Sequence, residues 1–239
     1  MYLGRKHLAL IFLFIFLLAM FGMENISGSG FKSEPVIEPF YRGNEDEKVI
    51  ALTFNVDWGE DVLPSILETL SKNGSPATFF ITGRFAANFP ELVKEIYEQG
   101  HEIGNHGYSH NHPNSANRRE NQEEILKTEE VIKKLIGEPE KLFAPPYGEC
   151  SPAVVEAAHD IGYKTIMWTI DTIDWKPGRT PESIAQKVHS RAQNGAIVLM
   201  HPRQVTVEAL PKIIGDLEQE GYTFKTVSQI ITPSSSQNN

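Results

Sequence analysis

The sequence predicts an α/β fold, a distorted and incomplete (β/α) barrel with about seven parallel strands. Short apolar runs rich in β-branched and aromatic residues alternate with longer segments of helical periodicity. About seven strands in roughly 190 residues suit a small barrel better than a long open sheet. The sequence contains no internal repeat and gives no sign of a second domain.

The strands are expected where apolar runs are short and rich in branched or aromatic side chains. Val49-Ile-Ala-Leu-Thr-Phe54 and Ala77-Thr-Phe-Phe-Ile-Thr82 are the clearest examples. In chain order, the expected strands are 49–54, 77–82, 101–103, 142–144, 164–168, 196–200 and 222–227. Because each is separated from the next by a helical segment, the strands should run parallel under a cover of helices.

The helices are expected in the intervals between these strands. Ser151-Pro152 and Thr180-Pro181 each have the form of an N-cap residue followed by proline at the first helical position. Glycines mark helix ends at Gly100, Gly137, Gly162, Gly195 and Gly221. The expected helices are 62–72, 90–99, 121–136, 152–161, 181–192 and 207–221.

Composition limits the classes of function. Of the 239 residues, 40% are hydrophobic and 22% charged, which is ordinary for a globular protein. The net charge of −9 argues against nucleic acid as a partner, because phosphate binding requires a basic surface. Cys150 is the single cysteine, so the chain forms no internal disulfide. We expect a monomer.

The two ends of the chain differ from its middle. Arg5, Lys6 and His7 precede an apolar run over 8–21, the pattern of an export signal. Residues 1–23 are interpreted as a signal peptide or a retained N-terminal anchor, with a buried core helix as the alternative. Residues 24–47 read as a linker, 48–231 as the folded domain and 232–239 as a disordered tail. The protein is therefore expected outside the cytoplasm, extracellular, in the cell wall or held at the membrane by its N-terminal segment.

Two histidines in the segment His106-Gly-Tyr-Ser-His110 stand four residues apart. On a helical turn this spacing places both rings on one face, where they can bind one metal ion. Asp57 is the natural third ligand, and an Asp-His-His set suits zinc, with cobalt or nickel as alternatives. The alternatives without a metal are surface histidines in a polar loop and an Asp in a turn with Gly59.

Polar clusters follow five of the expected strands. In folds of this class the chemistry gathers at the carboxyl ends of the strands, so these clusters should meet at one barrel mouth. The convergence favours a functional site over five unrelated loops. The clusters are Asn55-Val-Asp57, His106 with His110, Ala144-Pro-Pro-Tyr-Gly148, Asp171-Thr-Ile-Asp174-Trp175 and His201-Pro202.

Several residues of these clusters are candidates for chemistry. His201, at a strand end, is a candidate acid or base, and Asp171 either holds its imidazole in one tautomer or only ends a strand. The bend Pro145-Pro-Tyr-Gly148 either presents backbone N–H groups to an oxyanion or is a rigid turn. Tyr147, Trp175 and Trp58 either wall a sugar-binding groove or belong to the core.

The order of these motifs resembles the polysaccharide deacetylase (NodB-homology) family, and its sporulation-associated Gram-positive branch above all. The resemblance covers residues 48–231, nearly everything after the linker. It implies metal-dependent de-N-acetylation of N-acetylglucosamine-type sugars in peptidoglycan or a chitin-like glycan. The residues that carry it are Thr53-Phe-Asn-Val-Asp57, His106-Gly-Tyr-Ser-His110, Ala144-Pro-Pro-Tyr-Gly148, Asp171 with Trp175, and Leu199-Met-His201.

The resemblance also implies a role for each matching residue. Asp57, His106 and His110 would bind the metal, while His201 would act as the general acid with help from Asp171. Substrate contacts are expected from the side chains or backbone of Pro146, Tyr147, Trp175 and Leu199.

Two positions depart from the family pattern. The family carries an aspartate as general base where Asn55 stands, and an arginine that pairs with this base where Ala144 stands. An amide does not accept a proton as a carboxylate does, and a positioned base is worth about 10²–10⁴-fold in rate. The sequence therefore leaves two main hypotheses, a deacetylase and a glycan-binding relative without turnover. A different enzyme class, such as a phosphatase, is a remote third.

Overall fold

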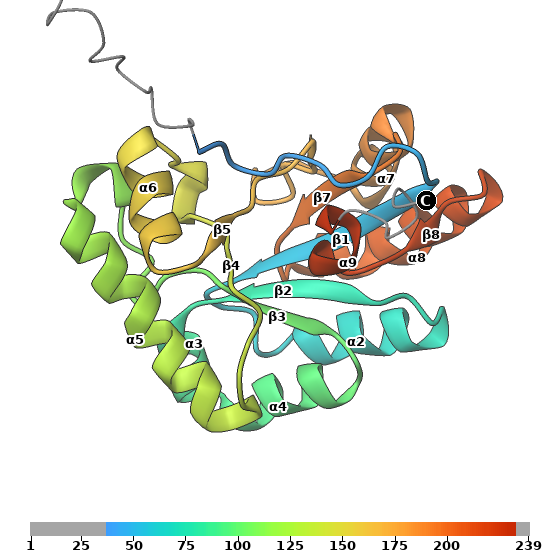
Figure 1. The fold of residues 1–239 in the computed structure, drawn as a ribbon. Helices are drawn as coiled ribbons and strands as arrows, with labels where there is room; N and C mark the ends of the chain where they lie inside the picture. Colours follow the sequence, from blue (N-terminus) through green and yellow to red (C-terminus); the bar gives the residue numbers. More distant parts are fainter. Residues whose placement is uncertain (1–36, 233–239) are drawn as a thin grey trace, which may run out of the picture. The chain divides into compact units, whose positions relative to one another are not determined.

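The computed structural model describes residues 37–232, drawn in colour in Figure 1. The predicted export segment, most of the predicted linker and the tail after Thr232 lie outside the described residues. Within 37–232, no helix has both the length and the apolar character that a membrane span requires.

All paired strands of the structure run parallel, in the order β5-β4-β3-β2-β1-β7-β6, with β8 added beside β1. No pairing within 37–232 joins the end strands β5 and β6, so the barrel is open, as the sequence predicted. The bounds are β1 Val49–Val56, β2 Ala77–Ile81, β3 Glu102–Asn105, β4 Leu142–Phe143, β5 Lys164–Thr165, β6 Ile170–Asp171, β7 Ala196–Met200 and β8 Thr223–Phe224.

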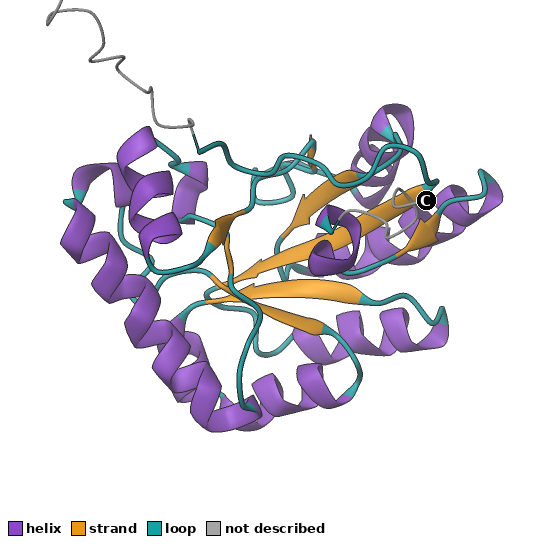
Figure 2. Ribbon diagram, viewed as in Figure 1, coloured by secondary structure: helices purple, strands orange, loops and turns teal. Residues whose placement is uncertain are grey.

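Helices surround the strands (Figure 2). Their caps come from the sequence: Asn117 and Thr180 each form a capping box, with Glu120 and Ser183 respectively. The helices are α2 Leu63–Lys72, α3 Gly83–Asn88, α4 Pro90–Glu98, α5 Arg118–Ile136, α6 Pro152–Asp160, α7 Pro181–Arg191, α8 Gln204–Gln219 and α9 Val227–Ile231.

Strand β1 is buried on both faces and organises the core. Its even positions, such as Leu52 and Phe54, belong to the large apolar cluster that α2 and α8 also supply. Its odd positions, Val49 and Ala51, belong to a second cluster that includes Ala144. Because side chains alternate along a strand, Asn55 lies on the same face of β1 as Val49 and Ala51. That face is where the site is built.

The sequence analysis did not predict three short elements, α3, β6 and α9. Helix α3 has six residues, too few for a periodic pattern, and its N-cap Thr82 was assigned to the preceding strand. Strand β6 has two residues, and α9 begins after a capping box at Thr226, inside the predicted strand 222–227. The predicted linker also reaches the sheet, where Phe40 bridges Ile166.

Candidate active site

The first part of the site is the end of β1. Asn55 is only 6% exposed, and its Oδ1 has no hydrogen-bond partner among the described residues. A buried polar atom without a partner costs about 1–3 kcal/mol, so this oxygen is poised for a ligand or water. Asp57 follows directly after the strand, with a side chain that is 9% exposed.

The second part is the segment 106–110, which we call the histidine loop. It is not the helical turn that the spacing suggested: Gly107 (φ 73°) and His110 (φ 54°) both have left-handed backbone conformations, which break a helix. The loop nevertheless brings the two rings together, with 5.0 Å between the ring centroids of His106 and His110. The predicted pair thus meets through a different backbone geometry.

His106 is held in a defined state. Its Nδ1 lies 2.6 Å from the carbonyl oxygen of Ala144, an acceptor, so Nδ1 carries the proton and Nε2 keeps its lone pair. Burial lowers the pKa of the His106 imidazole to about 3, and burial likewise lowers the pKa of His110. Both rings are therefore neutral at physiological pH. A neutral histidine that donates its other N–H to a backbone carbonyl is the usual arrangement of a metal ligand.

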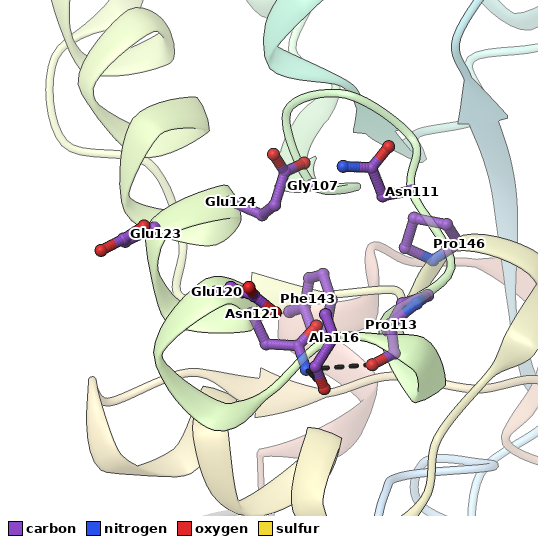
Figure 3. Close-up of a pocket in the computed structure, with 10 residues that line it drawn as sticks. All are labelled: Gly107, Asn111, Pro113, Ala116, Glu120, Asn121, Glu123, Glu124, Phe143 and Pro146. Carbon is purple, nitrogen blue, oxygen red and sulfur yellow. Dashed lines mark hydrogen bonds between the residues drawn. The ribbon is translucent and has the colours of Figure 1, made fainter.

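Glu124 of α5 holds the histidine loop in place. Its Oε2 accepts hydrogen bonds from the backbone N–H groups of Tyr108 (3.0 Å) and Ser109 (2.7 Å). Its Oε1 accepts from the Ser109 hydroxyl at 3.1 Å. Figure 3 shows this carboxylate beside Gly107. Both residues, together with Pro146, line a pocket of about 300 Å³. Sequence reasoning missed Glu124, because two of these three hydrogen bonds come from backbone N–H groups, which carry no residue signature.

Replacing Glu124 by Ala should lower the free energy of unfolding by about 2–3 kcal/mol, because two backbone N–H groups lose a charged acceptor. Chemical denaturation measures this loss. Glu123→Ala is the matched control, since Glu123 is exposed and its carboxylate pairs with the exposed Arg119 at 2.7 Å; it should change stability by less than about 0.5 kcal/mol. Equal effects of the two substitutions would contradict the anchoring role.

Asp57 meets the N-terminus of α3. Its Oδ1 accepts from the Thr82 hydroxyl at 2.9 Å and from Arg84 Nε at 2.6 Å, and its Oδ2 pairs with the terminal nitrogen of Arg84. Burial alone would raise the pKa of Asp57, but the hydrogen bonds from Arg84 and Thr82 outweigh it and lower that pKa. Asp57 is thus an ionised carboxylate whose oxygens already have partners.

His201 is oriented by Asp174, which corrects the expectation that Asp171 holds it. Asp174 Oδ1 lies 2.8 Å from His201 Nδ1, and Asp174 Oδ2 accepts from the His201 backbone N–H and the Thr206 hydroxyl, both at 2.7 Å. Asp171 instead accepts from the backbone N–H of Ile173 at 2.7 Å. Both carboxylates follow β6, so the sequence alone did not say which one turns toward His201.

The environment of Asp174 keeps it charged. Burial by itself raises the pKa of this carboxyl, but the hydrogen bonds from His201 and Thr206 outweigh burial and hold the pKa below its usual value. An ionised Asp174 fixes the proton of His201 on Nδ1 and stabilises the imidazolium when it forms. Nε2 of His201 then keeps its lone pair.

The predicted substrate contacts divide into exposed and buried residues. Tyr147 and Trp175 are 58% and 49% exposed, so neither belongs to the core. The Tyr147 ring stacks on the His112 ring, with 4.0 Å between the ring centroids. It meets the His110 ring edge to face, with 4.7 Å between the centroids. Leu199 is only 4% exposed within β7, so its side chain offers a glycan little surface.

A family model described as polysaccharide deacetylase matches residues 42–166. The uncharacterized protein YlxY of Bacillus subtilis is 40% identical over 195 residues, which cover 81% of this chain and 60% of YlxY. The chain belongs to the polysaccharide deacetylase family. A peptidoglycan-N-acetylglucosamine deacetylase of Bacillus cereus is 35% identical, with 81% of this chain and 72% of that protein covered.

One similar solved structure bears on the two positions that depart from the family pattern, Asn55 and Ala144. BA3943 of Bacillus anthracis, a CE4 family pseudoenzyme, is 38% identical with a TM-score of 0.79, covering 82% of this chain and 69% of that one. A mutant of BA3943 with restored enzymatic activity is equally similar in fold, with a TM-score of 0.79. Members of the polysaccharide deacetylase family that resemble this chain thus include both a deacetylase and a pseudoenzyme.

The donor chemistry of this family member suits a divalent metal only in part. The neutral imidazoles of His106 and His110 are suitable ligands. Asp57, however, is engaged by Arg84, and residues 37–232 contain no group of three or more His, Cys, Asp or Glu arranged to hold a metal ion. The side chain that pairs with Asp57 is Arg84, which the sequence motifs did not single out.

Proposed function

We propose that this protein is an exported, monomeric, metal-dependent de-N-acetylase of cell-wall glycan whose turnover is low because Asn55 stands in place of a carboxylate base. The observation that carries the proposal is the hydrogen bond from His201 to the ionised, buried Asp174. A histidine whose ring is oriented by an ionised carboxylate is suited to transfer protons. A purely structural histidine does not need such a partner. The peptidoglycan deacetylase among the relatives supports N-acetylglucosamine-type sugars as the substrate.

The residues would divide the chemistry between them. A divalent metal, zinc or else cobalt or nickel, would be held by Asp57, His106 and His110 and would polarise the acetamide carbonyl and the attacking water. His201 Nε2 would accept a proton from that water and deliver it to the departing amine, because no second carboxylate stands at Asn55. Tyr147 would line the sugar site beside His110.

A glycan-binding protein without turnover is the second candidate. Three observations favour it: the amide at Asn55, the methyl group at Ala144 and the ion pair of Arg84 with Asp57. Its support from relatives is the pseudoenzyme BA3943. Such a protein would keep the exposed Tyr147 and Trp175 as contacts for the sugar while lacking the base.

Acetate release separates the two candidates. Purified protein, loaded with zinc, cobalt or nickel in turn, is incubated with chitooligosaccharides and peptidoglycan while acetate is measured, and glycan binding is titrated in parallel. The proposed enzyme should release acetate when it is loaded with at least one of these metals. His201→Ala should lower or abolish this acetate release. Glycan binding without acetate, on all substrates and metals, would instead establish the second candidate.

Zinc bound in equilibrium dialysis against a fixed zinc concentration tests the ligand assignment. Substituting Asp57, His106 or His110 by Ala should each lower bound zinc by at least about tenfold, because a site with two protein ligands binds weakly. His159→Ala, at an exposed position of α6, is the matched control and should retain zinc as the unmodified protein does. Full zinc retention in His106→Ala would remove this histidine from the metal site.

A further inference from the structure

Arg84 is a cation built into the site. Its guanidinium lies against both carboxylate oxygens of Asp57, with Nε 2.6 Å from Oδ1. This two-pronged contact is the strongest geometry available to an arginine and a carboxylate. The Arg84 side chain is 49% exposed, whereas that of Asp57 is 9% exposed. The arginine can therefore swing into solvent while the carboxylate stays in the site.

The backbone delivers Arg84 to this position. The N–H groups of Gly83 and Arg84 donate to the carbonyls of Gly107 (3.0 Å) and Tyr108 (3.1 Å), so α3 begins directly on the histidine loop. A side chain at Gly83 would prevent this contact, because a Cβ there would lie 2.3 Å from the Tyr108 ring. The first turn of α3, the histidine loop and Asp57 thus form one rigid arrangement around the guanidinium.

The remaining capacity of Asp57 is small. A carboxylate has roughly four lone-pair sites. Three donors already occupy them: the Thr82 hydroxyl, Arg84 Nε and the Arg84 terminal nitrogen. A metal ion that bound Asp57 beside this guanidinium would also meet its positive charge at close range, and like charges there repel. Metal and guanidinium therefore exclude each other at Asp57.

We propose that Arg84 is a tethered cation that competes with the divalent metal for Asp57, so that the site binds metal only when the guanidinium has left. The proposal rests on the proposed function for its metal ligands, Asp57, His106 and His110. It adds a determinant of metal affinity that lies on α3, outside the ligand set. The unmodified protein should accordingly bind zinc weakly and hold its site together without it.

Zinc affinity of an Arg84→Met variant tests this competition. Methionine keeps an unbranched apolar stem and removes the charge, so zinc should bind about 10- to 1000-fold more tightly than in the unmodified protein, the usual effect of one nearby charge on a binding equilibrium. Titration against a chromophoric chelator measures the affinity without any activity assay. Arg84→Lys keeps the charge but loses the two-pronged contact with the carboxylate. Its zinc affinity should lie between those of the unmodified protein and Arg84→Met.

Thermal unfolding gives a second, independent readout. Without zinc, Arg84→Met should melt below the unmodified protein, because Asp57 is left as an uncompensated charge. Zinc should then raise the melting temperature of the variant more than that of the unmodified protein, since a tighter ligand stabilises more. Adding His110→Ala to Arg84→Met should abolish the gain and so locate it at the site.

Arg119→Met is the control for loss of a positive charge, because Arg119 is 86% exposed and pairs with Glu123 on α5; its zinc affinity should match the unmodified protein. Equal zinc affinity in the unmodified protein and in Arg84→Met, whether high or undetectable, would overturn the proposal. The proposed function fails by a different result, the absence of acetate release from protein that demonstrably holds zinc. The two ideas can therefore fall separately.

Discussion

Restoring a carboxylate and its cationic partner, by Asn55→Asp together with Ala144→Arg, should raise acetate release by about 10- to 1000-fold, part of the usual worth of a positioned base. Asn55 is buried and its Oδ1 has no partner among the described residues, so an acidic side chain of the same shape fits without repacking. Initial rates on zinc-loaded protein with chitooligosaccharides measure the gain.

The two substitutions should be strongly non-additive. Asn55→Asp alone places a second carboxylate near Asp57 in a buried position, where its pKa rises and less of it is available as a base. Ala144→Arg alone buries an unpaired cation. A complete double-mutant cycle of rates, with zinc content checked in each protein, measures the coupling.

The tight packing around Ala144 means that the arginine variant is expected to lose stability. The Ala144 side chain is 3% exposed in the second apolar cluster, which also holds Val49 and Ala51, and its carbonyl accepts a hydrogen bond from His106. An arginine there displaces neighbours, at about 1–3 kcal/mol for a larger side chain in a packed core. Denaturation curves therefore accompany the rates. A folded, zinc-loaded double variant with an unchanged rate would show that Asn55 does not occupy the base position.

Much of the fold could be predicted because its determinants are local in sequence. Strand β1 is buried on both faces, and six of its eight residues are apolar. The helix starts at Pro152 and Pro181 agree with the prediction. Elements of two to six residues, such as β6 and α3, were missed because they hold too few side chains to show a period. Their positions depend on tertiary contacts.

The residues of the site could be predicted from the sequence, but not the hydrogen bonds between them. The residue types pointed to Asp57, His106, His110 and His201, and all four follow strand ends of the same sheet. Which partner each one contacts depends on backbone turns that the sequence does not show. The left-handed His110 and the turn after β6 are examples, and they decide that Glu124 and Asp174 are the orienting groups.

Arg84 illustrates the same limit more sharply. Nothing in Thr82-Gly-Arg-Phe distinguishes this arginine from an ordinary surface residue, and half of its side chain is indeed in solvent. Its significance comes from the close approach of α3 to the histidine loop, which a glycine at position 83 permits. Pairing over 27 residues of sequence has no local pattern, so only the folded chain reveals it.

Asp174→Asn should abolish most of the deacetylase activity, with a loss of about 10²–10⁴-fold in rate, the range for a disabled acid or base. The amide removes the negative charge that holds the His201 proton on Nδ1 and stabilises the imidazolium. Rates are best compared in the Asn55→Asp, Ala144→Arg background, where activity is expected to be highest. Asp171→Asn is the matched control, because within residues 37–232 the Asp171 carboxylate accepts a hydrogen bond from the Ile173 backbone N–H and not from His201. The rate of this variant should stay within about threefold.

The pH dependence distinguishes a catalytic role of Asp174 from a structural one. Asp174→Asn should change the shape of the pH–rate profile as well as its height, because the ionised carboxylate that contacts the proton carrier His201 is then replaced by a neutral amide. A merely destabilised site would lower the rate equally at every pH. If Asp171→Asn instead proved the more damaging substitution, with both proteins folded, the orientation of His201 by Asp174 would not be the arrangement that works in catalysis. Equal retention of rate in both variants would show that neither Asp174 nor Asp171 is needed to orient the proton carrier during turnover.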